Sequence, residues 1–287
     1  MSITAPFRAA AILLLMFGLA ACSTSRTLDV APPLASTASM SVKYAAIVVD
    51  GSTGSVLYEA DSNAPRYPAS LTKMMTLYLL FEAMQQGRVT TATEIPISDY
   101  AARRPPSKLG LKPGQTIDVD MAIRALATKS ANDVAVAVGE YLGGSEEQFA
   151  QMMTAKARSL GMRGTTFRNA SGLPDVEQRT TARDMALLGL SLRKRFPAQF
   201  AYFSSQNFNF RGRNIRGHND LIGRVEGVDG IKTGYIRASG FNIVTSVNRG
   251  GRKLVVVVMG GNTARQRNAH VEELILRYLP QASAGGV

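Results

Sequence analysis

The chain has 287 residues, and 33 Lys and Arg against 21 Asp and Glu give it a formal net charge of +12. Hydrophobic residues make up 45% of the sequence and aromatic residues 7%, which excludes a disordered protein and allows a sizeable core. The single cysteine excludes an intrachain disulfide, and with two histidines neither a metal site nor another cofactor is expected. The basic residues are scattered and not interleaved with aromatic residues, so no nucleic-acid partner is expected.

The first 21 residues have the pattern of a secretory signal. Arg8 precedes the apolar run 9–21, which is shorter than the roughly 20 residues that span a bilayer and suits a signal-peptide core. The run ends with Leu-Ala-Ala before Cys22, and this ending resembles the lipobox of bacterial lipoproteins. The resemblance implies cleavage before Cys22 and a lipid on its thiol. A conventional signal cleaved nearby and a buried helix with an incidental cysteine are the alternatives.

The segment after this signal predicts a tethered domain. Residues 22–41 are rich in Ser, Thr, Ala and Pro and have no hydrophobic period, so we expect a flexible tether. The folded domain is expected to span 42–280, followed by a tail at 281–287. We therefore expect a protein of the bacterial periplasm that is held on a membrane through a lipid at Cys22.

Along the domain, strands are predicted at both ends and helices in the middle. Residues 44–50 and 55–59 predict a β-hairpin, and 71–84 a mostly buried helix. Residues 90–118 look irregular because they contain four prolines. Further helices are expected at 121–129, 133–142, 145–160, 181–195 and 264–279. Residues 241–247 and 254–259 predict a second hairpin. This order predicts an α+β domain whose terminal strands meet in one antiparallel sheet.

A serine and a lysine lie three residues apart where the first helix begins. Ser70 and Lys73 therefore share one face of that helix, and its N-terminus offers free N–H groups that stabilise negative charge. A desolvated lysine loses its proton more easily and can activate a serine hydroxyl as a base. The pair predicts a nucleophile that works without histidine, although an isolated match of this kind is as easily a capped helix with an exposed lysine.

Two further short patterns accompany this pair. Ser130 and Asn132 stand between two predicted helices, where a turn that caps backbone groups is the alternative interpretation. Lys232, Thr233 and Gly234 precede the last predicted hairpin. Chance gives this triplet only about 0.06 times per chain, so it carries more weight, although a simple β-turn would also explain it.

The three patterns, in this order and spacing, resemble the penicillin-recognising serine enzymes. Four blocks narrow the resemblance to the D-alanyl-D-alanine carboxypeptidase family, peptidase family S11: 67–74, 169–174, 181–186 and 228–234. The resemblance extends over about residues 42–279. It implies a β-lactamase/transpeptidase-like fold, in which an antiparallel sheet is flanked by helices and carries an inserted helical subdomain.

The resemblance also implies what the motif residues do. Ser70 would attack the carbonyl between two D-alanines at the end of a peptidoglycan stem peptide, Lys73 would be its base, and Ser130 would pass a proton to the leaving group. The remaining motif residues would bind substrate: Asn132, Lys232, Thr233, Gly234 and Tyr235. The N–H groups of Ser70 and Tyr235 would form the oxyanion hole. β-Lactams are expected as covalent inhibitors.

The sequence departs from the family pattern in two ways. The family often has a threonine where this chain has Ile236, and we expect Arg237 to replace that hydroxyl at the substrate carboxylate, because arginine binds carboxylates bidentately. A solvent-facing arginine is the alternative. Many family members also carry a β-rich domain after the catalytic one, which is not found here, so cleavage of peptidoglycan crosslinks by a DD-endopeptidase stays open.

Two other functions are weighed against a carboxypeptidase. A class A β-lactamase needs a carboxylate in a loop about 35 residues past Asn132, and residues 164–169 contain none. A non-catalytic cell-wall binding protein would not need the complete set of motifs. His218 and His270 are expected to be structural or surface residues.

Overall fold

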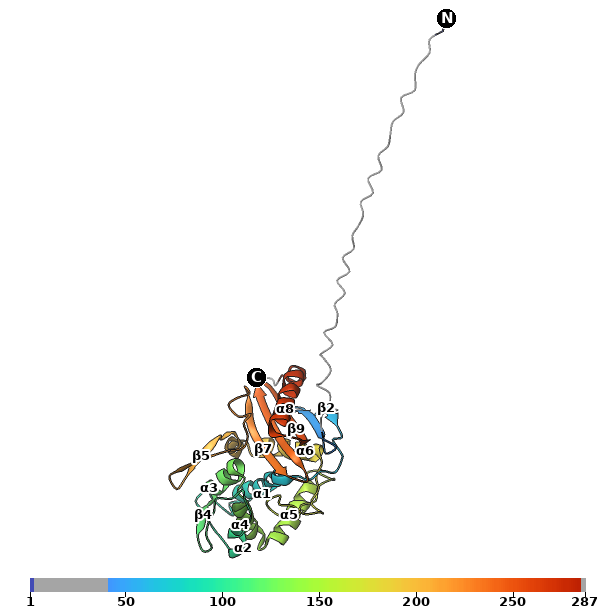
Figure 1. The fold of residues 1–287 in the computed structure, drawn as a ribbon. Coiled ribbons are helices and arrows are strands. Elements are labelled where there is room, and N and C mark those ends of the chain that lie inside the picture. The colour runs from blue at the N-terminus through green and yellow to red at the C-terminus, as the bar shows by residue number, and fades with distance from the viewer. Residues whose placement is uncertain (3–40, 285–287) are drawn as a thin grey trace. The chain divides into compact units, whose positions relative to one another are not determined.

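The structure, a computed structural model, describes residues 1–2 and 41–284. The predicted signal segment beyond its first two residues, Cys22 and the predicted tether up to residue 40 lie outside the described residues. The described part has an antiparallel sheet with helices on both of its faces and a block of helices beside it (Figure 1). The predicted α+β fold class is confirmed.

The sheet joins the beginning and the end of the domain. Its order is β2-β1-β9-β8-β7, and all pairs are antiparallel. The strands are β1 (Ala45–Asp50), β2 (Val56–Ala60), β7 (Val228–Ile236), β8 (Gly240–Arg249) and β9 (Arg252–Gly261). The two predicted hairpins are β1–β2 and β8–β9, and β1 pairs with β9 over its whole length. This pairing confirms that the terminal strands meet in one sheet.

Successive side chains of the central strands enter two different hydrophobic clusters. In β1, Ile47 lies in one cluster and Val48 in the other, and Val255 and Val256 of β9 alternate in the same way. The sheet is therefore buried on both faces. Double-sided burial removes the usual alternation with polar residues, which explains the uninterrupted apolar run in β9.

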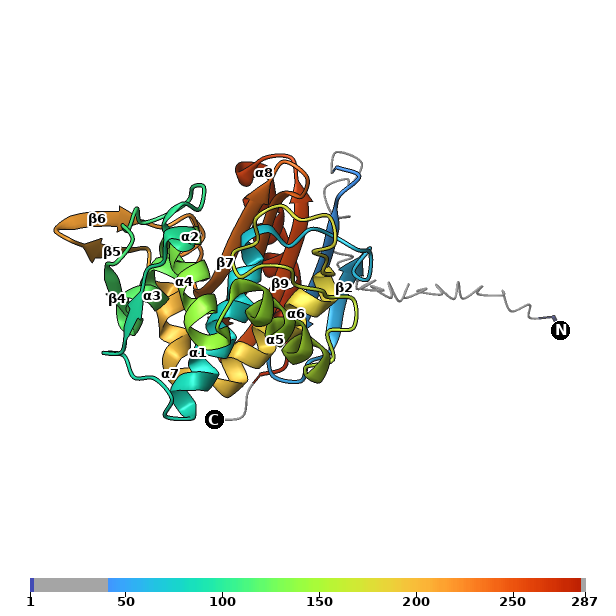
Figure 2. The same ribbon diagram turned by 90° about the horizontal axis from the view of Figure 1, so that it is seen from below.

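Helices cover both faces of the sheet. α6 (Ala182–Arg195) packs on β1 and β9 from one side, and α8 (Ala264–Tyr278) packs on β8 and β9 from the other. The other helices lie beside the sheet (Figure 2). The four longest of them are α1 (Lys73–Gln85), α3 (Val119–Arg124), α4 (Asn132–Gly143) and α5 (Glu146–Ser159), with a π-helical segment, η3 (Ala125–Lys129), between α3 and α4.

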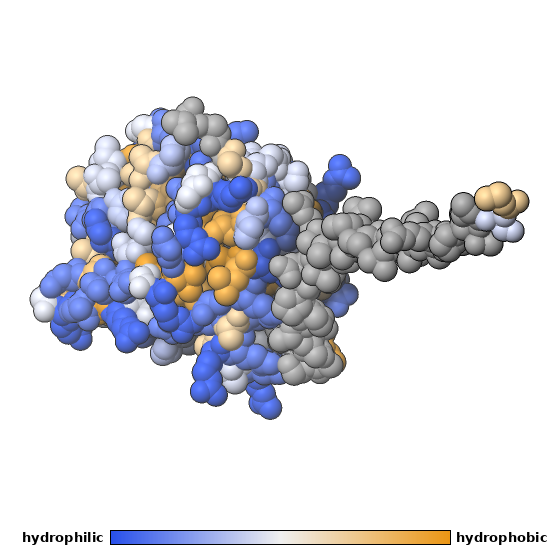
Figure 3. Space-filling model, turned by 90° about the horizontal axis from the view of Figure 1, so that it is seen from above, coloured by the Kyte–Doolittle hydropathy of each residue, from blue (hydrophilic) through white to orange (hydrophobic). Residues whose placement is uncertain are grey.

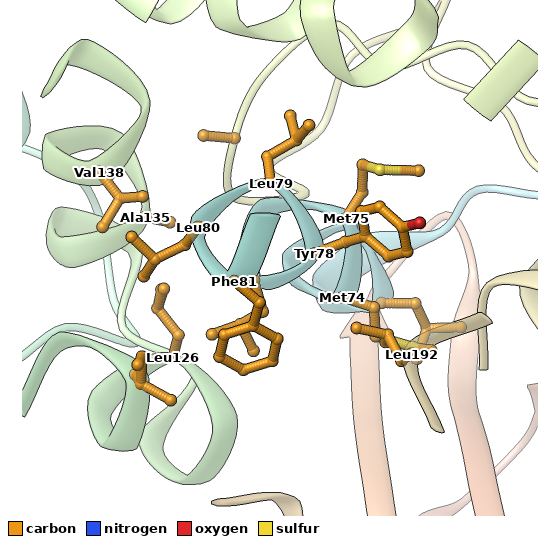
Figure 4. Packing of buried hydrophobic residues seen from close by; sticks show 14 of the residues in the cluster. Met74, Met75, Tyr78, Leu79, Leu80, Phe81, Leu126, Ala135, Val138 and Leu192 are labelled. Carbon is orange, nitrogen blue, oxygen red and sulfur yellow. The ribbon is translucent and has the colours of Figure 1, made fainter. Parts of the chain in front are cut away.

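The first helix, α1, is the centre of the main core. Leu80 faces Ala135 and Val138 of α4, and Met74 faces Leu192 of α6 on another side of the helix (Figure 4). Because α1 is buried nearly all round, it holds no amphipathic stripe, and its position is fixed by both the sheet and the helical block. The residues at its start are thus held rigidly between these two parts.

Three of the predicted helices, at 145–160, 181–195 and 264–279, begin at a capping side chain. The side chains of Ser145, Thr181 and Thr263 accept hydrogen bonds from N–H groups three residues on, at 3.2, 3.0 and 3.0 Å. Each bond satisfies an amide that has no partner within its helix.

The segments that connect these elements contain short structure that the sequence analysis missed. The stretch predicted as irregular holds β3 (Glu94–Pro96), α2 (Asp99–Ala102) and β4 (Thr116–Asp118). A hairpin of β5 (Asn207–Phe210) and β6 (Arg213–Arg216) follows α7 (Pro197–Phe200) and a 3-10 turn at Ala201–Ser204. Elements of three or four residues are too short to show a period, so tertiary contacts decide them.

The chain continues to pack after α8. A 3-10 turn at Leu279–Gln281 follows the helix, Ala282 is fully buried, and the N–H of Ser283 donates to Asp50 at 2.7 Å. Among the described residues, no helix has both the length and the hydropathy needed to cross a bilayer. The face seen in Figure 3 is largely hydrophilic with one hydrophobic area within it.

Candidate active site

The three sequence patterns meet in one pocket. Its volume is about 290 Å³, and it lies where the start of α1, the junction of η3 with α4, and the edge strand β7 come together. Six of the predicted residues line it: Ser70, Ser130, Asn132, Thr233, Gly234 and Tyr235. Lys73 and Lys232 are fully enclosed behind this lining.

The backbone that carries Ser70 is clamped between two glycines. Ser70 lies in a 3-10 turn, η2 (Ala69–Thr72), that leads into α1, and Ala69 has a left-handed φ of 50°. A Cβ atom on Gly172 would lie 1.8 Å from the Ala69 carbonyl oxygen, and one on Gly234 would lie 3.0 Å from the Ser70 nitrogen. Only glycine allows the two chains to approach the turn this closely, so they fix the position of the serine.

Lys73 is buried beside Ser70 and has three neighbours. Its Nζ donates to Asn132 Oδ1 at 2.7 Å and to the Ser171 carbonyl at 2.5 Å, and it lies 3.3 Å from Ser70 Oγ. Burial, together with the positive charge of Lys232, holds the pKa of Lys73 well below its usual value. A neutral amine has two N–H groups for the two carbonyl oxygens and keeps its lone pair for the serine hydroxyl. The geometry therefore suits a base acting on Ser70.

Ser130 sits at a strained point between two helices. Its φ and ψ are 62° and 40°, and its Oγ is buried without a hydrogen-bond partner among the described residues. Asn132, the first residue of α4, is held by its own contacts, because its Nδ2 donates to the Pro105 carbonyl at 2.9 Å. A buried hydroxyl without a partner at a strained residue is typical of a functional group.

Lys232 lies in the strand that forms the opposite wall. It is 1% exposed, and its Nζ donates to the Thr233 carbonyl at 3.0 Å. Burial, with a contribution from the charge of Arg267, lowers the pKa of Lys232 to about 7. The site thus holds two buried lysines whose charges oppose each other.

Arg237 was expected at the substrate carboxylate, and the structure shows where its side chain lies. Arg237 lies on the exposed turn between β7 and β8, and it is not among the residues that line the pocket. Arg267 of α8 lines the pocket instead, with its guanidinium held by the Asn242 carbonyl at 2.9 Å and by Asn268 Oδ1. Burial lowers the pKa of Arg267 to about 10, so it keeps its charge at neutral pH.

The pocket contains two ionisable residues, Arg267 and His218, that the sequence patterns did not assign to the site. No local pattern marks Arg267, because α8 brings it to the pocket from the far end of the chain. His218 is expected to be a structural or surface residue, and the structure shows it in the pocket lining. Burial, followed by the charges of Lys232 and Lys129, lowers the pKa of His218 to about 4, so its imidazole is neutral.

The fold and the arrangement of the three patterns define the class of protein: they are those of the penicillin-recognising serine enzymes. Within this class, the chain belongs to the D-alanyl-D-alanine carboxypeptidase family, peptidase family S11. The sequence model of that family matches residues 33–263.

Individual relatives agree with this assignment. The chain is 35% identical over 236 residues to the D-alanyl-D-alanine carboxypeptidase DacA of Escherichia coli. The aligned region covers 80% of this chain and 59% of that protein. It is 33% identical over 235 residues to DacF of Bacillus subtilis, covering 80% and 60%. The chain therefore spans about three fifths of the length of these curated relatives. The solved structure of penicillin-binding protein D2 from Listeria monocytogenes in its cefotaxime-bound form is 31% identical, with a TM-score of 0.74, and covers 81% of this chain and 95% of that one.

Proposed function

We propose that the chain is a serine-type D-Ala-D-Ala carboxypeptidase that acts on peptidoglycan stem peptides through an acyl-enzyme on Ser70. The observation that carries this proposal is the buried Lys73, with two of its contacts made to carbonyl oxygens and the third to the Ser70 hydroxyl. The family and the names of the relatives supply the substrate class.

In the acylation step Lys73 takes the proton of Ser70 as Oγ attacks the carbonyl carbon between the two D-alanines. The oxyanion that forms is held by the N–H groups of Ser70 and Tyr235, and each such donor contributes about 3 kcal/mol to transition-state stabilisation. Gly234 supports this role because it lets β7 approach the Ser70 turn.

The leaving D-alanine takes its proton from Ser130. The Ser130 hydroxyl is buried and without a partner, so it is available for this transfer, and Lys232 restores its proton. Asn132 binds the peptide amide while it also orients Lys73. Thr233 and Arg267 bind the terminal carboxylate of the peptide. Recognition of this group restricts cleavage to the C-terminal residue, as in a carboxypeptidase.

Hydrolysis of the acyl-enzyme completes the cycle with water. Among the described residues, the pocket lining contains no aspartate or glutamate. In class A β-lactamases a carboxylate activates the water that hydrolyses the acyl-enzyme, and the lining has no counterpart to it. This supports a carboxypeptidase that a β-lactam blocks, because the β-lactam acyl-enzyme would not be hydrolysed quickly. The cefotaxime-bound relative supports β-lactams as covalent inhibitors.

The proposal extends to location. Residues 1–21 are a lipoprotein-type signal peptide, Cys22 carries the lipid, and 22–41 tether the catalytic domain of residues 42–280 to a membrane in the periplasm. The support is the sequence pattern around Cys22. Metabolic labelling with a fatty acid tests it, because a Cys22→Ser variant is expected to take up no label.

The activity is tested with diacetyl-Lys-D-Ala-D-Ala and an assay for released D-alanine. Release is expected from the unmodified chain and not from Ser70→Ala. A labelled penicillin is expected to attach to the unmodified chain only. A chain that takes the label but releases no D-alanine would favour a DD-endopeptidase, and a chain that does neither would contradict the proposal.

A further inference from the structure

The hairpin β5–β6 projects from the body in both ribbon views (Figures 1 and 2). Its strands pair in register, and the buried side chains of Phe208 and Phe210 anchor it in the main hydrophobic cluster. At its base the N–H of Gly217 donates to the Gln206 carbonyl at 2.8 Å. The hairpin is therefore a firmly attached structure that reaches outward.

The hairpin is strongly basic. Arg211, Arg213 and Arg216 are exposed, and residues 207–216 contain no acidic residue. The ion pair of Arg216 with Asp220 is itself exposed on both sides, at 84% and 51%, so it contributes little. Among the described residues, neither Arg211 nor Arg213 has a carboxylate within ion-pair distance. Arg211 does donate a hydrogen bond to Gln115 at 3.4 Å. All three guanidinium groups nevertheless lie on the surface, where an external anion can reach them.

The base of the hairpin is part of the pocket. His218, two residues after the end of β6, lines the pocket together with Ser70. A Cβ atom on Gly217 would lie 2.9 Å from the Thr128 side chain, which belongs to the segment that leads to Ser130. A polymer whose end occupies the pocket can therefore lie along the hairpin without crossing the molecule.

The outward face has the chemistry of a glycopeptide-binding surface. In the register of the hairpin, Asn207 pairs with Arg216 and Asn209 with Asn214, so these four exposed residues share one face. Arg211 lies in the turn at the tip, and Arg213, which pairs with Phe210, is exposed on the other face. Amides hydrogen-bond sugars and peptide groups, and arginine binds carboxylates. The face has no apolar side chain that would insert into a bilayer.

We propose that the hairpin β5–β6 is a polymer-binding arm that holds the carboxylate groups of peptidoglycan outside the pocket. This inference rests on the proposed function. It assigns to the arm a role in binding the polymer, whereas the pocket alone handles the terminal D-alanines. A short peptide ends before it reaches the arm.

The test compares two triple variants of the full chain, both in a Ser70→Ala background that leaves the polymer intact. The arm variant is Arg211→Gln, Arg213→Gln and Arg216→Gln. The control variant removes three exposed cations elsewhere: Arg88→Gln, Arg163→Gln and Lys194→Gln. In sedimentation with purified peptidoglycan sacculi at low salt, we expect about tenfold weaker binding for the arm variant only, because three exposed charge contacts are lost. Blocking the carboxylates of the sacculi by amidation is expected to weaken binding of the unmodified chain by a similar factor.

Equal binding by both triple variants would overturn the proposal, and so would a loss of binding to anionic phospholipid vesicles that matches the loss on sacculi. In the Ser70 enzyme, the arm variant is expected to release D-alanine from diacetyl-Lys-D-Ala-D-Ala at the unmodified rate. Absence of release from every variant would contradict the proposed function, whereas the sacculus measurement would still decide on the arm.

Discussion

At the scale of single residues, the two buried lysines divide the work by their protonation states. Lys73 is lowered in pKa first by burial and then by the charge of Lys232, so the charge of one favours the neutral form of the other. In the proposed reaction, Lys73 must be unprotonated to accept the proton of Ser70, whereas Lys232 must be protonated to restore the proton of Ser130. The pocket provides one lysine suited to each task.

This coupling predicts the effect of Lys232 on the pH dependence of acylation. The rate of acylation by a penicillin should rise with pH as Lys73 loses its proton. Without the charge of Lys232, Lys73 keeps its proton to a higher pH. Lys232→Met should therefore move the acidic limb of the rate–pH profile to higher pH. Lys232→Arg keeps the charge and should leave the limb in place, even if both variants react slowly. Rate constants measured between about pH 5 and 10 decide this, and equal limbs in the two variants would disprove the coupling.

Arg267 and Arg237 form a matched pair for the carboxylate-binding role. Arg267→Ala removes a charge-assisted hydrogen bond worth about 1.5–3 kcal/mol, so kcat/KM on a D-Ala-D-Ala peptide should fall about ten- to a hundredfold. Arg237→Ala should leave it unchanged because that side chain lies outside the pocket lining.

A peptide with a C-terminal amide controls for indirect effects of the Arg267 change. On this substrate Arg267→Ala should react about as fast as the unmodified chain, because no carboxylate is present. A large loss on both substrates would indicate a structural defect, and thermal unfolding of the variant would reveal it.

At the scale of the elements, the site depends on close backbone contacts around the turn before α1. Gly172 and Gly161 both have positive φ, at 85° and 82°, but only Gly172 faces another chain segment at short range. A β-carbon at Gly161 has nothing within 4 Å. An alanine at either position pays the conformational cost of a positive φ, but only an alanine at Gly172 would also displace the Ser70 turn. Comparing the two therefore separates these effects.

Gly172→Ala should reduce penicillin acylation by at least about tenfold, since its Cβ cannot coexist with the Ala69 carbonyl and the Ser70 turn must move. Gly161→Ala should cost about 1–2 kcal/mol of unfolding free energy with little change in acylation. Stopped-flow acylation and urea unfolding of both variants measure the two effects. Equal acylation rates would mean that the turn is not held by this contact.

The elements also show how far the sequence leads. The long helices and the apolar runs of the central strands depend on local patterns, so these elements could be predicted. β3, β4 and the hairpin β5–β6 could not, because three or four residues carry no period. The motif residues from Ser70 to Thr233 could be assigned through the family resemblance. Arg267 could not, because it reaches the pocket only when α8 docks on the sheet.

At the scale of the whole molecule, the motifs are not sufficient for the site. A chain that ends at residue 250 contains Ser70, Lys73, Ser130 and Lys232 but lacks β9, which lies between β1 and β8 in the sheet. We expect this chain to show no cooperative unfolding by circular dichroism and no penicillin labelling. A chain that ends at residue 284 should show both. Labelling of the shorter chain would contradict the dependence of the site on the closed sheet.

The pairing of β1 with β9 also sets when the protein can fold. β1 can pair with β2 at once, but its second neighbour, β9, is available only after almost the whole sequence has left the ribosome, and such long-range pairing is slow. If the chain is exported as proposed, slow closure of the sheet gives it time to cross the membrane while it is still unfolded. On that proposal, we expect the catalytic geometry to form only after export, so that no active hydrolase accumulates in the cytoplasm that makes the chain.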